Sequence, residues 1–170
     1  GRQLSASQAG LLLSAMPVAM AVVAPVSGTL SDWVGSRLPS VLGMAILAAG
    51  LFLLARLGPQ APLAQVALAL GVAGLGIGIF VSPNTSALMG SAPRHRQGIA
   101  AGILATARNV GMVLGVGLSG AVFTTVLARR SAAAAGGLYD AIRISLYAAA
   151  GFALLGLILS AARGNSNTGA

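Results

Sequence analysis

Long apolar runs separated by short polar stretches form the dominant pattern of this 170-residue chain. A helix needs about 20 mostly apolar residues to cross the hydrocarbon core of a bilayer, and five runs approach or exceed that length. We therefore predict an all-α membrane domain over residues 1–170, a polytopic helical bundle with a polar tail at 163–170. The five expected transmembrane helices cover about 7–26, 39–55, 63–81, 98–127 and 141–162.

Prolines fall at several places that matter for these helices. Pro17 and Pro25 lie inside the first span, where we expect a kink or local unwinding that neighbouring helices compensate. Pro39 is expected to open the second span, because a proline in the first turn lacks only an N–H that has no partner there. Pro83 is expected to close the third span.

The composition agrees with a membrane protein. The chain is 56% hydrophobic and only 7% charged, with a mean hydropathy of +0.91. Soluble domains carry about 25% charged residues, so this chain has too few to cover a surface that faces water. We expect an integral membrane protein whose surroundings are the lipid bilayer.

The net charge of +8 comes from arginines at the ends of the apolar runs. They form no basic stripe and have few aromatic neighbours, so we expect no nucleic-acid partner. Anchoring at lipid headgroups explains their positions better. Alternate loops and termini carry four arginines on one side of the membrane and five on the other, so charge does not assign the orientation.

Residues that could perform catalysis are scarce. The chain has no cysteine, one histidine (His95), two aspartates and no glutamate. A histidine without partners does not make a metal site, and no nucleophile motif accompanies His95 and Asp32. We expect no enzymatic activity, no metal and no bound cofactor.

Glycines are concentrated in the third and fourth spans. Small residues let membrane helices approach closely, and Gly98/Gly102 and Gly111/Gly115 are two pairs with the small-xxx-small spacing. We expect at least one glycine face of the fourth span to pack tightly against another helix. The predicted packing residues are Gly74, Gly78, Gly98, Gly102, Gly111 and Gly115.

Arg108 lies inside the fourth span, about 15 Å from its start at 1.5 Å per residue. A charged side chain at that depth is costly and is a candidate functional residue. Two interpretations remain open: Arg108 and Asn109 face a functional cavity inside the bundle, or they bond to a neighbouring helix and hold the bundle together. No acidic residue lies within a predicted span, so if the protein moves protons, the carboxylate that carries them would have to lie outside this sequence.

The first polar stretch, 28–37, holds Asp32 and Arg37 around Gly28 and Gly35 and predicts a tight hairpin loop. It resembles the loop signature of the major facilitator superfamily of secondary transporters. The later stretches 74–83, 93–102 and 107–111 are similar to one subgroup, the fourteen-spanner drug:proton antiporters. Order and spacing agree over about 10–123, as in the last five helices of that fold.

The resemblance implies part of the C-terminal half of a major facilitator, with an N-terminal half of the same transporter as its missing partner. It implies proton-coupled multidrug efflux by alternating access, from a bacterial cytoplasmic (inner) membrane. Gly28, Asp32, Gly35 and Arg37 would form a conformational gate. Trp33 and Ser36 stand where basic residues are usual, so this gate has fewer charged partners.

Two alternatives accompany this interpretation. The small-molecule substrate of a major facilitator could instead be a metabolite, such as a sugar acid or an amino acid. The chain could also be a membrane scaffold subunit that transports nothing.

Overall fold

The computed structural model describes residues 5–129 and 137–162, and it confirms the all-α prediction. Each of the five α-helices is long and apolar enough to cross a membrane. Within the described residues no strand occurs. The helices are α1 (Ala6–Val34), α2 (Arg37–Arg56), α3 (Leu63–Ser91), α4 (Gln97–Arg129) and α5 (Gly137–Ala162), with a short 3-10 helix, η1 (Arg94–Arg96), before α4.

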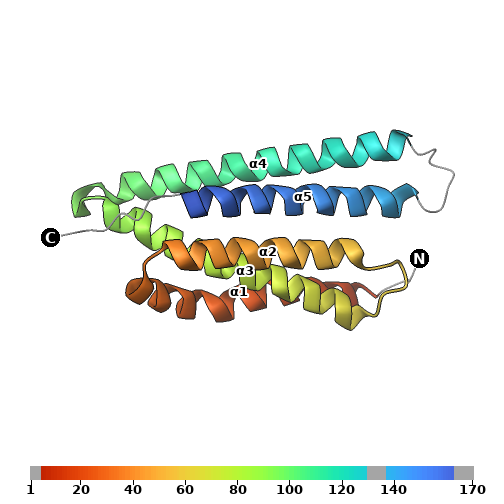
Figure 1. Ribbon diagram of the computed structural model, residues 1–170, viewed down its shortest axis with the longest axis horizontal. Helices are drawn as coiled ribbons and strands as arrows, with labels where there is room; N and C mark the ends of the chain where they lie inside the picture. The colour runs from red at the N-terminus through yellow and green to blue at the C-terminus, as the bar shows by residue number, and fades with distance from the viewer. Residues whose placement is uncertain (1–4, 130–136, 163–170) are drawn as a thin grey trace.

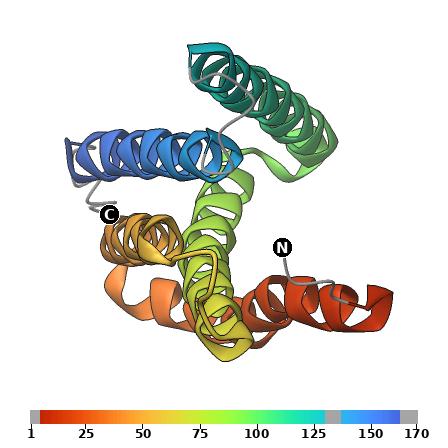
Figure 2. The same cartoon turned by 90° about the vertical axis from the view of Figure 1, so that its right-hand side faces the viewer.

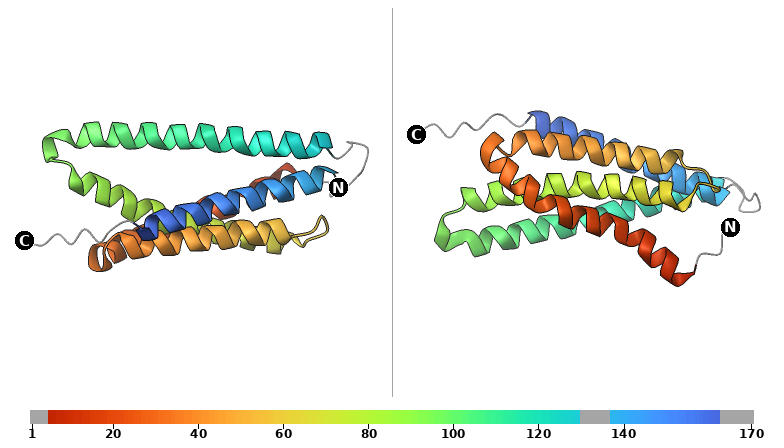
Figure 3. Two further views of the ribbon diagram at one scale, coloured as in Figure 1. Left: turned by 45° about the horizontal axis from the view of Figure 1, so that its top comes forward. Right: turned by 90° about the horizontal axis from the view of Figure 1, so that it is seen from below.

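Helix α3 lies at the centre of the arrangement (Figure 1). It packs along both α1 and α2, while α5 packs on the other side of α2. Helix α4 contacts mainly α5, and Figure 2 shows α4 and α1 at opposite edges of the bundle. The N-terminal part of α1 also leans away from the other helices (Figure 3).

Small residues make the interfaces of α3. A Cβ atom added to Gly43 of α2 would lie 2.7 Å from the backbone nitrogen of Phe80, and one added to Gly50 would lie 2.6 Å from that of Ala73. On the other side of α3, a Cβ on Gly78 would lie 3.1 Å from the carbonyl oxygen of Met20. Such close backbone approach is the usual reason for glycine inside membrane helices. Gly78 therefore lies in close contact with the backbone of α1.

Gly74 and Gly76 make equally close contacts on opposite sides of α3. A Cβ on Gly74 would overlap the backbone of Met16 in α1. A Cβ on Gly76 would lie 2.7 Å from the Cα of Leu47 and 2.8 Å from the carbonyl oxygen of Gly43. Gly74 thus packs on α1 and Gly76 on α2.

Gly76→Ala is expected to destabilise the protein by about 1–3 kcal/mol, because its methyl group would meet backbone atoms that cannot move aside. Gly71→Ala is the matched control on the same helix, since nothing lies within 4 Å of a Cβ there. The control should be neutral or stabilise by up to about 1 kcal/mol, because alanine favours the helix. Thermal unfolding in detergent measures both, and equal effects would contradict this packing.

The predicted loop 28–37 is wrong in extent. Helix α1 continues through Gly28 and Asp32 to Val34, so only Gly35 and Ser36 connect it to α2. The helix is uninterrupted at Pro17 and Pro25, without the predicted unwinding. The polar residues beyond Pro25 remain helical because their hydroxyls bond to carbonyls of their own helix: Thr29 donates to Val26 (3.0 Å) and Ser31 to Gly28 (2.7 Å).

The predicted end of the third span at Pro83 is also wrong. Helix α3 runs ten residues past 81 to Ser91, with Pro83 inside it and buried. A proline has no N–H, so the carbonyl of Ile79, four residues earlier, loses its normal helical donor. The hydroxyl of Ser27 in α1 donates to this carbonyl at 2.9 Å. A side chain on a neighbouring helix thus replaces the missing bond, and α3 continues.

The remaining boundaries differ less from prediction. Helix α2 begins at Arg37, with Pro39 in its first turn as expected. Helix α4 exceeds the predicted span by one residue at its start and two at its end, and α5 begins at Gly137 rather than at 141. Asp140 therefore lies in the first turn of α5. Residues 130–136 of the predicted loop and the predicted polar tail 163–170 lie outside the described residues.

Candidate functional site

The predicted gate residues lie at the junction of α1 and α2. Gly28 faces α3, where a Cβ would lie 3.0 Å from the Ser82 hydroxyl oxygen. Gly35 caps α1 with a φ of 79°, in the left-handed region that glycine adopts without strain. Asp32 is exposed in the last turn of α1, and Arg37 is the first residue of α2.

Arg37 follows α1 in the sequence, but its side chain bonds to α5. Its guanidinium donates a hydrogen bond to the carbonyl oxygen of Ala161, in the last turn of α5. Carbonyls at a helix C-terminus have no intrahelical donor and carry partial negative charge, so a cation is favourable there. Between 5 and 162, leaving out 130–136, no ion pair joins Arg37 to Asp32. The gate arginine therefore links α2 to α5.

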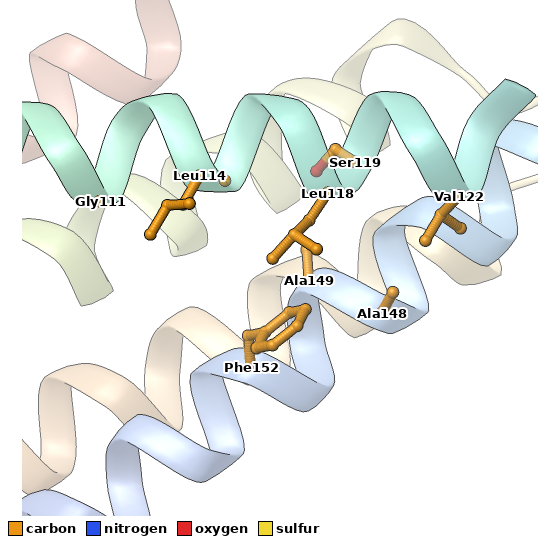
Figure 4. A pocket seen from close by; sticks show the side chains of 9 residues that line it. Gly111, Leu114, Leu118, Ser119, Val122, Ala148, Ala149 and Phe152 are labelled. Atoms are coloured by element: carbon orange, nitrogen blue, oxygen red, sulfur yellow. The ribbon is translucent and has the colours of Figure 1, made fainter.

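Helices α4 and α5 line a partly open apolar cavity of about 330 Å³. In Figure 4, Leu118 and Val122 project from α4 toward α5, and Phe152 projects from α5 toward α4. Gly111 and Gly115 lie on the same wall as the two α4 side chains. Volumes of about 300–1,000 Å³ with mostly apolar walls are typical of small-molecule sites.

Tight packing of the α4 glycines is not observed, and this prediction is wrong within the described residues. A Cβ added to Gly98, Gly102, Gly111 or Gly115 would meet nothing within 4 Å. Gly111 and Gly115 do face α5, but across the cavity instead of in contact. The spacing of Gly111 and Gly115 places both on the face of α4 toward α5, but neither glycine is in tight contact with a described helix.

Arg108 and Asn109 are both exposed on α4. Arg108 does not line the cavity, but it precedes Gly111 by three residues and Gly115 by seven. Residues at these spacings share one face of a helix. Arg108 therefore extends the cavity-lining face of α4 toward its N-terminal end. The predicted contact of Arg108 with a cavity or an adjacent helix is not seen among the described residues.

Metal-ligating side chains do not gather in this fold. Among residues 5–129 and 137–162, no group of three or more His, Cys, Asp or Glu side chains could hold a metal ion. His95 lies exposed in η1, between Arg94 and Arg96. The polar groups of interest are thus the Asp32–Arg37 junction and the Arg108 face of α4.

Sequence reasoning missed Ser27, a buried residue that precedes the gate glycine Gly28 and joins α1 to α3. Its side chain is only 3% exposed, and its hydroxyl donates to the carbonyl of Ile79 in α3. The sequence contained a signal: a hydroxyl residue directly after a long apolar run, together with a proline in another apolar span. What it lacked was the pairing of these two segments, which are 52 residues apart.

Comparison with known proteins finds similarity to bacterial transporters. The chain is 40% identical to the uncharacterized transporter YebQ of Escherichia coli over 111 residues, 65% of this chain and 24% of YebQ. It is 32% identical to the riboflavin transporter RibZ of Clostridioides difficile over 126 residues, 74% of this chain and 28% of RibZ. It is 31% identical to the multidrug resistance protein Stp of Mycobacterium tuberculosis over 121 residues, 71% of this chain and 22% of Stp.

The chain thus spans about a quarter of the length of these relatives. The family model of the Major Facilitator Superfamily matches residues 2–166, nearly the whole sequence. Five apolar helices, a glycine-capped α1–α2 junction and this match agree. The chain is an integral membrane protein and belongs to the Major Facilitator Superfamily of transporters.

Proposed function

We propose that this chain is part of a secondary active transporter that exports drugs or other amphipathic small molecules by alternating access, with protons as the coupling ion. The observation that carries the proposal is the apolar cavity between α4 and α5, on a helix face that continues to Arg108. An apolar wall beside one charged group suits a substrate with a large apolar body and a polar end.

The relatives support the substrate class. Stp is named a multidrug resistance protein, and a further relative with 30% identity over 154 residues is the quinolone resistance protein NorB of Staphylococcus aureus. From these relatives we also propose that the chain lies in a bacterial cytoplasmic (inner) membrane and is not an enzyme. Proton coupling would need a carboxylate outside this sequence, because Asp32 and Asp140 both lie at helix ends.

We also propose that an N-terminal half-transporter completes the substrate pathway. Major facilitators alternate access by rocking two six-helix halves around a central site. This chain supplies five helices and covers about a quarter of its relatives. In the complete transporter, the Asp32 and Arg37 junction would gate one face through its contact with α5.

A second candidate function is transport of a metabolite that carries an anionic or hydrogen-bonding group. Arg108 favours it, since it is the ionisable side chain deepest in α4 and is positively charged. RibZ, a relative, is named a riboflavin transporter. The other alternative, a scaffold without transport, lacks an observation in its favour.

Everted membrane vesicles that contain the intact protein test these functions. Uptake of ethidium and norfloxacin is expected to exceed uptake in empty vesicles at least threefold (on the order of 0.65 kcal/mol in rate) and to stop when a protonophore removes the proton gradient. Riboflavin uptake without drug uptake would favour the metabolite transporter. If none of the three compounds moves, both transport proposals are wrong for these substrates.

Asp32→Asn in the same vesicles tests the gate assignment. The substitution keeps the shape of the side chain and removes its charge, so we expect transport to fall while the protein still reaches the membrane. Unchanged transport would remove Asp32 from the gate.

A further inference from the structure

Two arginines at the end of the bundle opposite the gate are held against aromatic rings. The Arg56 guanidinium carbon lies 4.8 Å from the centroid of the Phe52 ring in α2. That of Arg143 lies 5.8 Å from the centroid of the Tyr147 ring in α5. The two rings contact each other with centroids 5.7 Å apart at an interplanar angle of 55°. The four side chains form one continuous row across the α2–α5 interface.

The row lies at one edge of the membrane core. The carbonyl of Ala161 receives the hydrogen bond from Arg37, so these two residues share a level at the gate end. At 1.5 Å per residue, Arg56 lies about 28 Å from Arg37 along α2, and Arg143 lies about 27 Å from Ala161 along the antiparallel α5. The hydrocarbon core is about 30 Å thick. Both guanidiniums therefore reach the headgroup level of the opposite face.

Their contacts leave the guanidiniums able to bind an anion. A guanidinium held near an aromatic ring still carries N–H groups that can match phosphate oxygens in a bidentate arrangement. Both arginines are exposed. Asp140 lies one turn before Arg143, so two positive charges and one negative charge share this region and the local balance stays positive.

An apolar surface adjoins the charges on the membrane side. Phe52 is 43% exposed and Leu53 is 42% exposed, although both belong to a membrane-spanning helix. A ligand at this position meets positive charge at headgroup depth and apolar side chains below it. A phospholipid with a net negative headgroup matches both, because its phosphate faces the charges and its acyl chains face the apolar side chains. A soluble phosphate matches only the charges.

We propose that Arg56 and Arg143, positioned by Phe52 and Tyr147, bind the phosphate of an anionic phospholipid whose acyl chains lie along the exposed surface of α2. The aromatic pair joins the ends of α2 and α5, so both arginines belong to one region at the interface of these helices. This site is separate from substrate transport and requires only that the helices span a membrane.

The test measures binding of a fluorescent phosphatidylglycerol to the intact protein in a neutral detergent, with fluorescent phosphatidylcholine as the zwitterionic comparison. Arg56→Gln/Arg143→Gln is expected to weaken phosphatidylglycerol binding about tenfold, because each arginine supplies charge-assisted hydrogen bonds. Phosphatidylcholine binding should change less than about twofold, since it lacks the net charge. Glycerol phosphate at millimolar concentration should compete poorly, because it has no acyl chains.

The control is Arg94→Gln/Arg96→Gln, which removes the same charge from the exposed η1 at the other end of the bundle. This control should retain phosphatidylglycerol binding within about twofold. Equal weakening in both double variants would mean a general charge effect and would overturn the site. Unchanged binding in Arg56→Gln/Arg143→Gln would overturn it too, and so would full competition by glycerol phosphate.

Arg56→Lys/Arg143→Lys provides a second measurement if the glutamine variant does not fold. Lysine preserves the charge but not the planar fork. We expect this variant to bind phosphatidylglycerol at least threefold more weakly than the native protein. Native-like affinity would show that the arginine geometry has no role, contrary to the proposal.

Discussion

Arg108→Ala is expected to lower transport at least about tenfold, which corresponds to about 1.4 kcal/mol in the transport barrier. The same substitution should leave the thermal stability in detergent unchanged or raise it. An ionised arginine at mid-span costs about 2.5–3.5 kcal/mol on insertion scales, and alanine removes that cost. Arg108 is exposed on the face of α4 that lines the cavity, so its loss breaks no contact with a described helix.

The two measurements together separate the two roles considered for Arg108. A residue that binds substrate loses transport without losing stability, whereas a residue that holds helices together loses both. Arg129→Ala, at the exposed end of the same helix, is the control and should change neither by more than about twofold in rate or about 0.5 kcal/mol. Full transport by Arg108→Ala would remove it from the pathway.

Ser27→Ala is expected to destabilise the protein by about 0.6–2 kcal/mol, because it leaves the Ile79 carbonyl without a donor. The effect should depend on Pro83. Pro83→Ala supplies an N–H that can bond to this carbonyl within α3. In the Pro83→Ala background, Ser27→Ala should therefore cost close to zero. The double-mutant cycle, measured by thermal unfolding in detergent, should give a coupling of about 1 kcal/mol.

Ser14→Ala is the matched control for this cycle. Ser14 also lies on α1, but its hydroxyl donates to Leu11 of its own helix at 2.7 Å. Its removal should have the same small effect with and without Pro83, because its partner Leu11 lies in α1 and not in α3. If Ser27→Ala costs equally in both backgrounds, the replacement of the proline's missing bond by Ser27 is not what stabilises α3.

The number and class of the helices could be predicted from the sequence, because hydrophobic length alone specifies a membrane span. The ends of α1 and α3 could not, since the polar stretch 28–37 indicates a loop and Pro83 indicates a helix end when each helix is considered by itself. In the structure Ser27 compensates for Pro83 from another helix. Boundaries that depend on a tertiary hydrogen bond are not contained in local propensity.

The candidate site was predicted unevenly for a similar reason. The spacing of glycines identified a face on α3 and a face on α4, but only α3 has close neighbours for its glycines. Both helices have the same glycine spacing. Whether the glycines pack tightly depends on how close a neighbouring helix lies. Gly35 needed no such context, because a positive φ at the end of a helix is a local requirement of the backbone.

The central place of α3 has a consequence for synthesis of the protein. Helices α1 and α2 emerge before α3, yet they contact each other little and are joined through α3. Ser27 and the close glycine contacts of α1 and α2 have their partners only after α3, a further 29 residues, has been made. At about 5–20 residues per second this takes seconds. During that interval the insertion machinery must shield the unpaired faces of α1 and α2. These two helices can pack on α3 once α3 has left the ribosome.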